Sequence, residues 1–289
     1  MIKLIATDMD GTLLNGAHEV SNENYEAIKY AQSKGITVVI ATGRAFYEAN
    51  SPIEKTDLTL PYICLNGAEV RDEEFNIVHT SKLTRPLINK ITGVLNKEDI
   101  YYQVYTNFGI YTEDPEKDLE IYVDIAEKAG QKADVKKIRA NIQSRIDNGT
   151  LKTVDSYDEI ENRPGEIILK ILAFASDLTK IDRAKAEISE SKSLAVSSSS
   201  RGNIEITHSD AQKGIALEEI ANQLNIPMSD VMAIGDNLND VSMLEKAGYA
   251  VAMENGAPEV KEIADYVTDT NEHSGVGKAI IHALKNYDR

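Results

Sequence analysis

Near its N-terminus the chain reads Lys3-Leu4-Ile5-Ala6-Thr7-Asp8-Met9-Asp10-Gly11-Thr12-Leu13-Leu14. The apolar run from Leu4 to Ala6 shows no polar alternation, which is typical of a parallel strand that is covered on both faces. The run ends at two carboxylates, Asp8 and Asp10, and open α/β sheets bind ligands at the carboxyl ends of such strands. Two carboxylates this close repel each other unless a cation or a shared proton lies between them. The stretch alone is also compatible with an acidic turn, so its interpretation depends on the rest of the chain.

Further apolar runs end in the same way. Residues 36–41 and 62–65 read as buried strands, and they end at Thr42-Gly43-Arg44 and Asn66-Gly67. Helices are expected between the strands, one over residues 21–34 and one around Tyr47 that Pro52 interrupts. Strand, helix, strand, helix, strand is the pattern of a doubly wound parallel sheet. The pattern resumes near the C-terminus with a helix over 213–224 and a strand over 231–234 that ends at Gly235-Asp236.

The middle of the chain shows a different order of expected strands and helices. Residues 84–208 read as a separate α+β unit, while residues 138–163 give no clear pattern. The expected strands cover 101–105, 109–112, 167–174, 194–198 and 203–207, and the expected helices cover 86–96, 116–129 and 177–189. We therefore predict one domain formed by residues 1–83 and 209–289 and a second domain, residues 84–208, inserted into it.

The composition excludes several classes of function. The chain has 31 basic and 47 acidic residues and a formal charge of −16, whereas a surface that binds a nucleic-acid backbone needs a basic stripe. The five histidines are scattered and the single cysteine, Cys64, lies in an apolar run, so we expect neither a zinc site nor a disulfide. Met1 leads directly into the first strand and no apolar run approaches about 18 residues, which predicts a cytoplasmic protein.

The polar groups at the strand ends can converge. The carboxyl ends of parallel strands lie side by side, so Asp8, Thr42 and Asp236 are expected at one edge, together with Lys213. Carboxylate oxygens are the ligands that Mg²⁺ prefers. A carboxylate nucleophile, a second carboxyl as proton donor, a metal and donors for the phosphoryl oxygens are the groups that phosphoryl transfer needs.

Four of these motifs resemble, in order, those of the haloacid dehalogenase (HAD) superfamily. They are Asp8-Met9-Asp10-Gly11-Thr12, Thr42-Gly43-Arg44, Lys213-Gly214 and Gly235-Asp236-Asn237-Leu238-Asn239-Asp240. Three stretches are similar to those of the Cof-like phosphatase branch of this superfamily: Asp10-Gly11-Thr12-Leu13-Leu14, Asn66-Gly67-Ala68 and the motif that begins at Gly235. The resemblance covers essentially the whole chain. It implies a doubly wound, Rossmann-like α/β core with an inserted α+β cap domain.

The resemblance also implies a role for each matching residue. Asp8 would attack phosphorus, and Asp10 would protonate the leaving group and then activate water. Thr12 would hold Asp10 in place. Mg²⁺ would be bound by the Asp8 carboxylate, the Asp10 backbone carbonyl and Asp236. The remaining residues would contact the phosphate or the substrate, namely Thr42, Gly43, Arg44, Asn66, Lys213 and Asn239, with Asp240 orienting Lys213 or a metal-bound water.

Four of these residues also have purely structural interpretations. Thr42 can cap a helix, and Lys213 can be a solvated helix residue. Asn66 can be part of an ordinary turn, and Arg44 can be a surface charge. The ordered motifs favour the functional interpretation for Thr42 and Lys213, and they leave Asn66 and Arg44 open.

The spacing of the motifs places the insert. Between Asp10 and Thr42 lie 31 residues, and between Thr42 and Lys213 lie 170, so only the second gap can hold a domain. In the Cof-like branch an insert at this position is a lid that excludes water and reads the leaving group. We expect a Mg²⁺-dependent phosphatase for a small phosphorylated metabolite, with a sugar phosphate as first candidate. We expect a monomer or small homo-oligomer that binds neither nucleic acid nor membrane.

Two alternatives remain at this point. Within the enzyme class, the substrate is a cofactor phosphate such as pyridoxal phosphate or flavin mononucleotide. Outside it, the chain is a non-catalytic sensor that binds a phosphorylated metabolite, although a pure binder has no need for an acid/base at Asp10. The hairpin loop around Arg201 and Asn203 is expected to face the leaving group.

Overall fold

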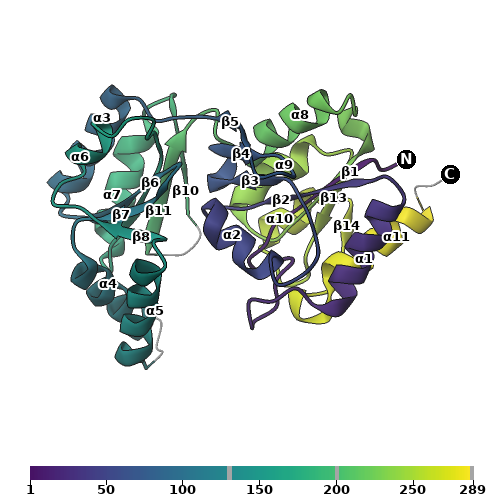
Figure 1. The fold of residues 1–289 in the computed structure, drawn as a ribbon, viewed down its shortest axis with the longest axis horizontal. Coiled ribbons are helices and arrows are strands. Elements are labelled where there is room, and N and C mark those ends of the chain that lie inside the picture. Colours follow the sequence, from purple (N-terminus) through teal and green to yellow (C-terminus); the bar gives the residue numbers. More distant parts are fainter. Residues whose placement is uncertain (129–131, 199–201, 287–289) are drawn as a thin grey trace. The chain divides into compact units, whose positions relative to one another are not determined.

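The structure, a computed structural model, describes residues 1–128, 132–198 and 202–286. The chain divides into two compact units, Met1–Thr80 with Asp210–Arg289 and Ser81–Ser209. The first unit is therefore built from both ends of the chain and the second from its middle (Figure 1). The domain limits expected at residues 84 and 208, and the roles of core and cap, stay predictions.

In the first unit, eight strands of the described chain form one sheet, which Figure 1 shows with its helices. Six of these strands are parallel to one another, and the two at one edge, Glu69–Arg71 and Ile77–Thr80, extend the sheet by antiparallel pairing. The doubly wound α/β fold is confirmed. The strand order is β14 (Tyr266–Val267), β13 (Tyr249–Ala252), β12 (Val231–Gly235), β1 (Leu4–Thr7), β2 (Thr37–Ala41), β3 (Tyr62–Cys64), β4 (Glu69–Arg71) and β5 (Ile77–Thr80).

Helices cover both faces of this sheet, which explains why its central strands are continuous apolar runs. Side chains from α8 (Lys213–Gln223), α9 (Val241–Lys246) and α10 (Pro258–Ile263) pack with Leu4 and Ala6 of β1 in one cluster. The intervening Ile5 points to the opposite face, because side chains alternate along a strand, and it too is fully buried.

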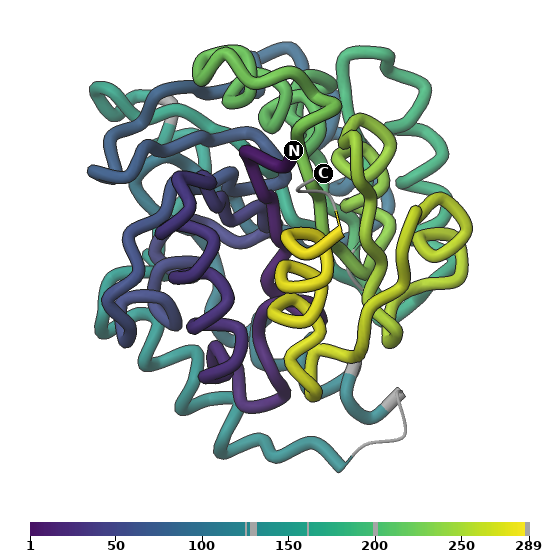
Figure 2. Tube along the Cα trace, turned by 90° about the vertical axis from the view of Figure 1, so that its right-hand side faces the viewer, coloured from purple at the N-terminus to yellow at the C-terminus, as the bar shows by residue number. Residues whose placement is uncertain are grey.

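The helix α1 (Asn22–Ser33) begins after Ser21, whose side chain accepts from the Asn24 backbone N–H and caps the helix. It lies beside the C-terminal helix α11 (Gly275–Asn286), as the purple and yellow segments of Figure 2 show. The side chain of Asn24 is fully buried at this junction. Its Nδ2 donates to the Leu13 carbonyl (3.0 Å) and its Oδ1 accepts from the Gly277 N–H (2.8 Å). One amide thus joins α1, α11 and the loop after β1.

One expectation for this unit is corrected. Pro52 lies within α2 (Phe46–Ile53) and does not interrupt it. A proline cannot donate to the carbonyl four residues earlier, which here belongs to Glu48. That carbonyl accepts instead from Nη1 of Arg44 (3.1 Å), so the helix keeps a donor at this position.

In the second unit, six described strands form one sheet. Side chains alternate along β11 (Asn203–His208): Ile204 and Ile206 belong to the apolar core, and Asn203 and Glu205 take the alternate positions, which face the other side of the sheet. Helices α3 (Arg85–Lys97) and α7 (Leu178–Ser189) contribute to that core. The strand order is β10 (Leu194–Ser197), β11 (Asn203–His208), β9 (Ile168–Phe174), β6 (Tyr101–Thr106), β7 (Gly109–Thr112) and β8 (Leu151–Thr153).

The stretch without a clear pattern folds as α5 (Val135–Asp147), β8 and α6 (Asp158–Glu161), after α4 (Pro115–Lys128). Two expectations lie outside the described residues. They concern Ala129, the expected end of the helix over 116–129, and Arg201 of the hairpin loop that is expected to face the leaving group. Cys64 is a buried free thiol, as expected. In the part of the chain that the structure describes, no helix combines the length and apolarity needed to cross a membrane.

Replacing Asn24 with Ala should destabilise the first unit. The change leaves the Leu13 carbonyl and the Gly277 N–H buried without their partner, which costs about 2–4 kcal/mol for the pair. Urea unfolding measures this loss. Asn22→Ala, at an exposed position of the same helix, is the control and should change stability by less than about 0.5 kcal/mol. Equal effects of the two substitutions would contradict the role of the buried amide.

Candidate active site

The strand ends meet as the sequence predicted. β12, β1 and β2 are adjacent and parallel, and Thr7 pairs with both Ile234 and Ile40. Asp236, Asp8 and Thr42 follow the ends of these strands, so one edge of the sheet presents three polar side chains. These three residues are far apart in the sequence, but they lie on adjacent strands, which are about 5 Å apart in a sheet.

Lys213, the first residue of α8, is the buried cation of this edge. Its side chain is fully buried, and its Nζ lies 2.7 Å from Asp8 Oδ1 and 2.6 Å from Asp240 Oδ1. Burial by itself would lower the pKa of Lys213, but the Asp240 and Asp8 carboxylates outweigh that effect and raise it. The ammonium therefore stays charged. The next residue, Gly214, allows the first turn of α8 to pack closely against the backbone of Ser242. A Cβ at Gly214 would lie 2.0 Å from the Ser242 carbonyl oxygen.

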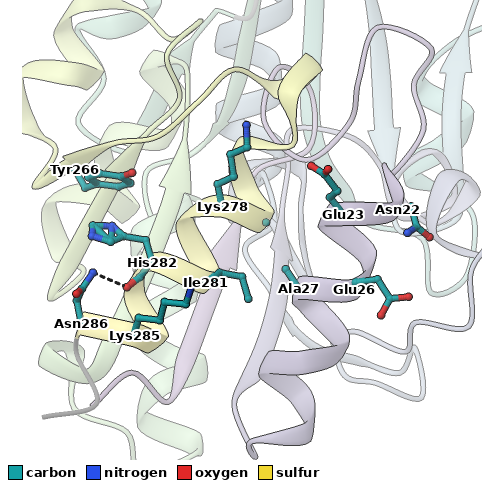
Figure 3. Close-up of a pocket in the computed structure, with 11 residues that line it drawn as sticks. Asn22, Glu23, Glu26, Ala27, Tyr266, Lys278, Ile281, His282, Lys285 and Asn286 are labelled. Carbon is teal, nitrogen blue, oxygen red and sulfur yellow. Dashed lines mark hydrogen bonds between the residues drawn. The ribbon is translucent and has the colours of Figure 1, made fainter.

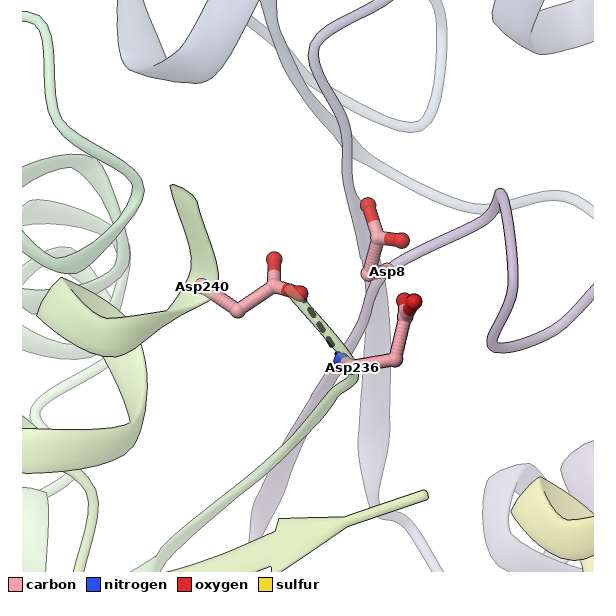
Figure 4. Close-up of side chains that lie close together, drawn as sticks. All are labelled: Asp8, Asp236 and Asp240. Atoms are coloured by element: carbon pink, nitrogen blue, oxygen red, sulfur yellow. Dashed lines mark hydrogen bonds between the residues drawn. The ribbon is translucent and has the colours of Figure 1, made fainter. Parts of the chain in front are cut away.

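Asp240 holds the site together through both of its oxygens. While Oδ1 accepts from Lys213, Oδ2 accepts from the backbone N–H groups of Asp236 (2.9 Å) and Asn237 (3.0 Å). Figure 4 shows the Asp240 carboxylate bonded to the Asp236 backbone. The strand end at β12 and the start of α8 are thus tied to the same carboxylate.

Asp8 and Asp236 can hold a divalent cation. Oxygens of Asp8, Asp236 and Asp240 lie within 4.8 Å of one another (Figure 4). Asp240 uses both oxygens for Lys213 and backbone amides, so Asp8 and Asp236 are the two carboxylates of this group that could bind a cation. Burial raises the pKa of Asp8, and Lys213 opposes the increase. Burial also raises the pKa of Asp236 to about 6. A cation between the two carboxylates would offset the repulsion between their negative charges. Carboxylate oxygens are hard ligands, which suit Mg²⁺.

Asp10 has a different environment from Asp8. Its side chain is 50% exposed, and Arg44 donates to both of its oxygens, from Nε to Oδ2 at 2.7 Å and from Nη2 to Oδ1. His18 Nδ1 lies 3.8 Å from Oδ1. Arg44, expected to contact the substrate, is thus paired with Asp10 in this structure. Thr12, expected to hold Asp10, donates instead to Asp236 Oδ1 at 2.7 Å.

Three of the remaining predicted residues, Thr42, Gly43 and Asn66, follow the ends of β2 and β3, and the fourth, Asn239, follows β12. Thr42 is buried, its hydroxyl accepts from the Arg44 backbone N–H (3.2 Å) and its carbonyl accepts from the Asn66 N–H (3.0 Å). Gly43 lies between Thr42 and Arg44 in the chain. Asn66 adopts a left-handed backbone (φ 59°), and Asn239 donates to its Oδ1 at 3.2 Å. The structure therefore connects Asn66 and Asn239 to the same edge.

Sequence reasoning missed two residues. The Ser242 hydroxyl accepts from the Gly214 N–H at 3.1 Å, which fixes the first turn of α8. The Asn255 side chain donates to the Gly11 carbonyl at 2.7 Å. Asn255 follows the end of β13, so the rule that selected Asp8 and Asp236 could have found it.

A groove of about 710 Å³ lies elsewhere in the first unit, between α1 and α11 (Figure 3). The rings of Tyr266 and His282 pack at one side of it, with centroids 4.2 Å apart. None of the predicted site residues is among its described lining residues. The groove is therefore separate from the carboxylate site.

The chain is similar to proteins of one family. Residues 5–280 match the model of the haloacid dehalogenase-like hydrolases. Over 285 residues the chain is 36% identical to phosphatase YwpJ of Bacillus subtilis, with 98% of this chain and 100% of YwpJ covered. It is 35% identical to the 5-amino-6-(5-phospho-D-ribitylamino)uracil phosphatase YwtE of the same organism, with 98% of each covered. A solved haloacid dehalogenase-like hydrolase from B. subtilis has a TM-score of 0.84 at 34% identity, covering 97% of this chain and 99% of its own.

Replacing Asp240 with Asn should destabilise the site. An amide cannot accept from Lys213 and from two backbone N–H groups at once, because its nitrogen is a donor. Breaking this buried pair should lower the free energy of unfolding by about 3 kcal/mol, measured in urea. Glu245→Gln removes one exposed carboxylate from α9 and serves as the control. If Asp240→Asn lowers the free energy of unfolding by no more than the control does, the stabilising role of Asp240 is refuted.

Proposed function

The chain belongs to the haloacid dehalogenase-like hydrolases and is a phosphatase, and we propose that it hydrolyses a small phosphate monoester through an intermediate on Asp8. The observation that carries the proposal is the buried Asp8 carboxylate, held by Lys213 and followed two residues later by a half-exposed Asp10. Two carboxyl groups in such different environments can take different roles.

In the first step, an Asp8 oxygen attacks phosphorus and the bond from phosphorus to the leaving oxygen breaks. Asp10 gives its proton to that oxygen, so the product leaves as a neutral alcohol. In the second step, Asp10 takes a proton from water while the water oxygen attacks phosphorus and releases Asp8. Lys213 and Thr42 offset the negative charge on the phosphoryl oxygens.

Mg²⁺ would be held by Asp8, the Asp10 backbone carbonyl and Asp236. When bound, it would supply positive charge beside the phosphoryl group. Arg44 must release Asp10 when the leaving oxygen needs the proton, and Asn66 and Asn239 are proposed to contact the substrate. These assignments rest on the carboxylate geometry and on the family.

For the substrate, we propose a phosphate ester of a polyhydroxylated chain. A sugar phosphate is the first candidate. YwtE, whose name specifies a 5-phospho-D-ribitylamino compound, favours the phosphate of such a ribityl compound as the second. A panel should rank sugar phosphates, 5-amino-6-(5-phospho-D-ribitylamino)uracil, flavin mononucleotide and pyridoxal phosphate by kcat/KM. Preference for pyridoxal phosphate would contradict the proposed class. Preference for flavin mononucleotide, whose phosphate is also carried by a ribityl chain, would support the cofactor alternative within that class.

Asp8→Asn should abolish hydrolysis of p-nitrophenyl phosphate, because an amide does not attack phosphorus. Asn has nearly the shape of Asp and keeps an oxygen for Lys213, so circular dichroism should show an intact fold. Phosphate release measures the activity. Turnover close to that of the unaltered enzyme would refute the role of Asp8.

Mg²⁺ should raise the melting temperature of the chelator-treated protein. At about 100 times its Kd, a ligand of the folded state adds about 2.7 kcal/mol of stability. A carboxyl whose pKa is raised to about 6 destabilises the fold above that pH unless a cation replaces the proton. The increase should therefore be full near pH 7.5 and should shrink as the pH falls through about 6.

Asp236→Asn is the matched variant for this measurement. Without the ion it should melt at or above the temperature of the unaltered protein, and it should lose most of the Mg²⁺-dependent increase. An increase that survives the substitution, or one that grows at low pH, would contradict the proposed metal site.

A further inference from the structure

The loop between β1 and α1, residues 8–21, carries Asp10 but has little regular structure of its own. Within the described residues, three asparagine side chains donate to its backbone carbonyls. Asn24 binds the Leu13 carbonyl at 3.0 Å and Asn271 binds the Leu14 carbonyl at 2.9 Å. Asn255 binds the Gly11 carbonyl at 2.7 Å, next to Asp10. The loop is therefore held from outside, by the helix that follows it and, at Gly11 and Leu14, by segments distant in the sequence.

The orientation of the Asn255 amide is fixed by its two partners. Its Oδ1 accepts from the Asn271 backbone N–H at 3.0 Å, and its Nδ2 donates to the Gly11 carbonyl. A backbone N–H can only donate and a carbonyl can only accept, so the reversed amide would satisfy neither group. Asn255 is exposed to solvent, so no demand of the hydrophobic core explains this arrangement.

The turn that Asn255 holds is also packed against the metal site. Gly11 has a φ of +78°, and a Cβ there would lie 2.5 Å from Asp236 Oδ2. The Thr12 hydroxyl donates to Asp236 Oδ1. Asp236 therefore limits the turn on one side, and Asn255 holds its carbonyl from another. The direction of the Asp10 side chain follows from the backbone of this turn.

We propose that Asn255 is a positioning residue of the phosphatase reaction, which places Asp10 by fixing the Gly11 carbonyl. This inference rests on the proposed function, in which Asp10 protonates the leaving oxygen. Asn255 itself touches no reacting atom. Its loss changes where Asp10 points without removing Asp8, Lys213 or the metal ligands.

A leaving group of low pKa departs without a proton, whereas a more basic one requires the acid. A misplaced Asp10 should therefore slow phenyl phosphate more than p-nitrophenyl phosphate. The value of kcat/KM reports this first step, since it covers events up to the first irreversible one. A substitution that only loosens the fold would lower kcat/KM for both esters by the same factor.

The test is Asn255→Ala in the full-length enzyme with Mg²⁺. We expect kcat/KM for phenyl phosphate to fall about tenfold further than kcat/KM for p-nitrophenyl phosphate, a fraction of what a general acid contributes. Asn255→Asp keeps an acceptor for the Asn271 N–H but cannot donate to Gly11, so it should show the same selective loss. Asn255→Asp replaces Asn255→Ala in the test if the alanine variant does not fold.

Asn271→Ala is the matched control. It removes the same kind of bond from the same loop, at Leu14 instead of Gly11, and should leave the ratio of the two kcat/KM values unchanged. Equal losses for both esters in the Asn255 variants, or an equal change of the ratio in Asn271→Ala, would overturn the inference. Either result would leave the proposed function standing if Asp8→Asn is inactive, whereas an active Asp8→Asn would remove the proposed function itself.

Discussion

The contact of the Lys213 ammonium with Asp8 and Asp240 is the interaction on which the rest of the site depends. Both carboxylates are almost completely buried, and a buried charge without a partner is strongly unfavourable. One cation between two anions leaves a net negative charge, which favours a second cation close by. The same arrangement thus opposes the effect of burial on the pKa of Asp8 and prepares the edge of the sheet for a metal and a phosphoryl group.

The fold provides this contact through close approach of backbone segments. α8 reaches the edge of the sheet because Gly214 lets its first turn lie against the Ser242 carbonyl. The opposite side of the site depends on Gly11, whose left-handed backbone turns the chain against Asp236. Any side chain at either position would push apart the elements that carry Lys213, Asp8 and Asp236.

The central strands of the first unit could be predicted because burial on both faces leaves continuous apolar runs, as at Leu4–Thr7 and Val231–Gly235. Residues 135–147 could not, since their helix is largely polar and buries only Ile142 among its described residues. The partners of Thr12 and Arg44 were also missed. A side-chain partner depends on the direction of the preceding turn, and the sequence pattern does not report that direction.

The sequence by itself determined which residue types stand at the strand ends, in which order, and in which gap an insert can lie. These are properties of local pattern and spacing along the chain. Only the tertiary structure decided that Asp240 supports Lys213, that Arg44 pairs with Asp10, and that Asn255 holds Gly11. Each of these contacts joins residues from different elements, and hydrogen bonds act over about 3 Å, a distance that only the packed fold defines.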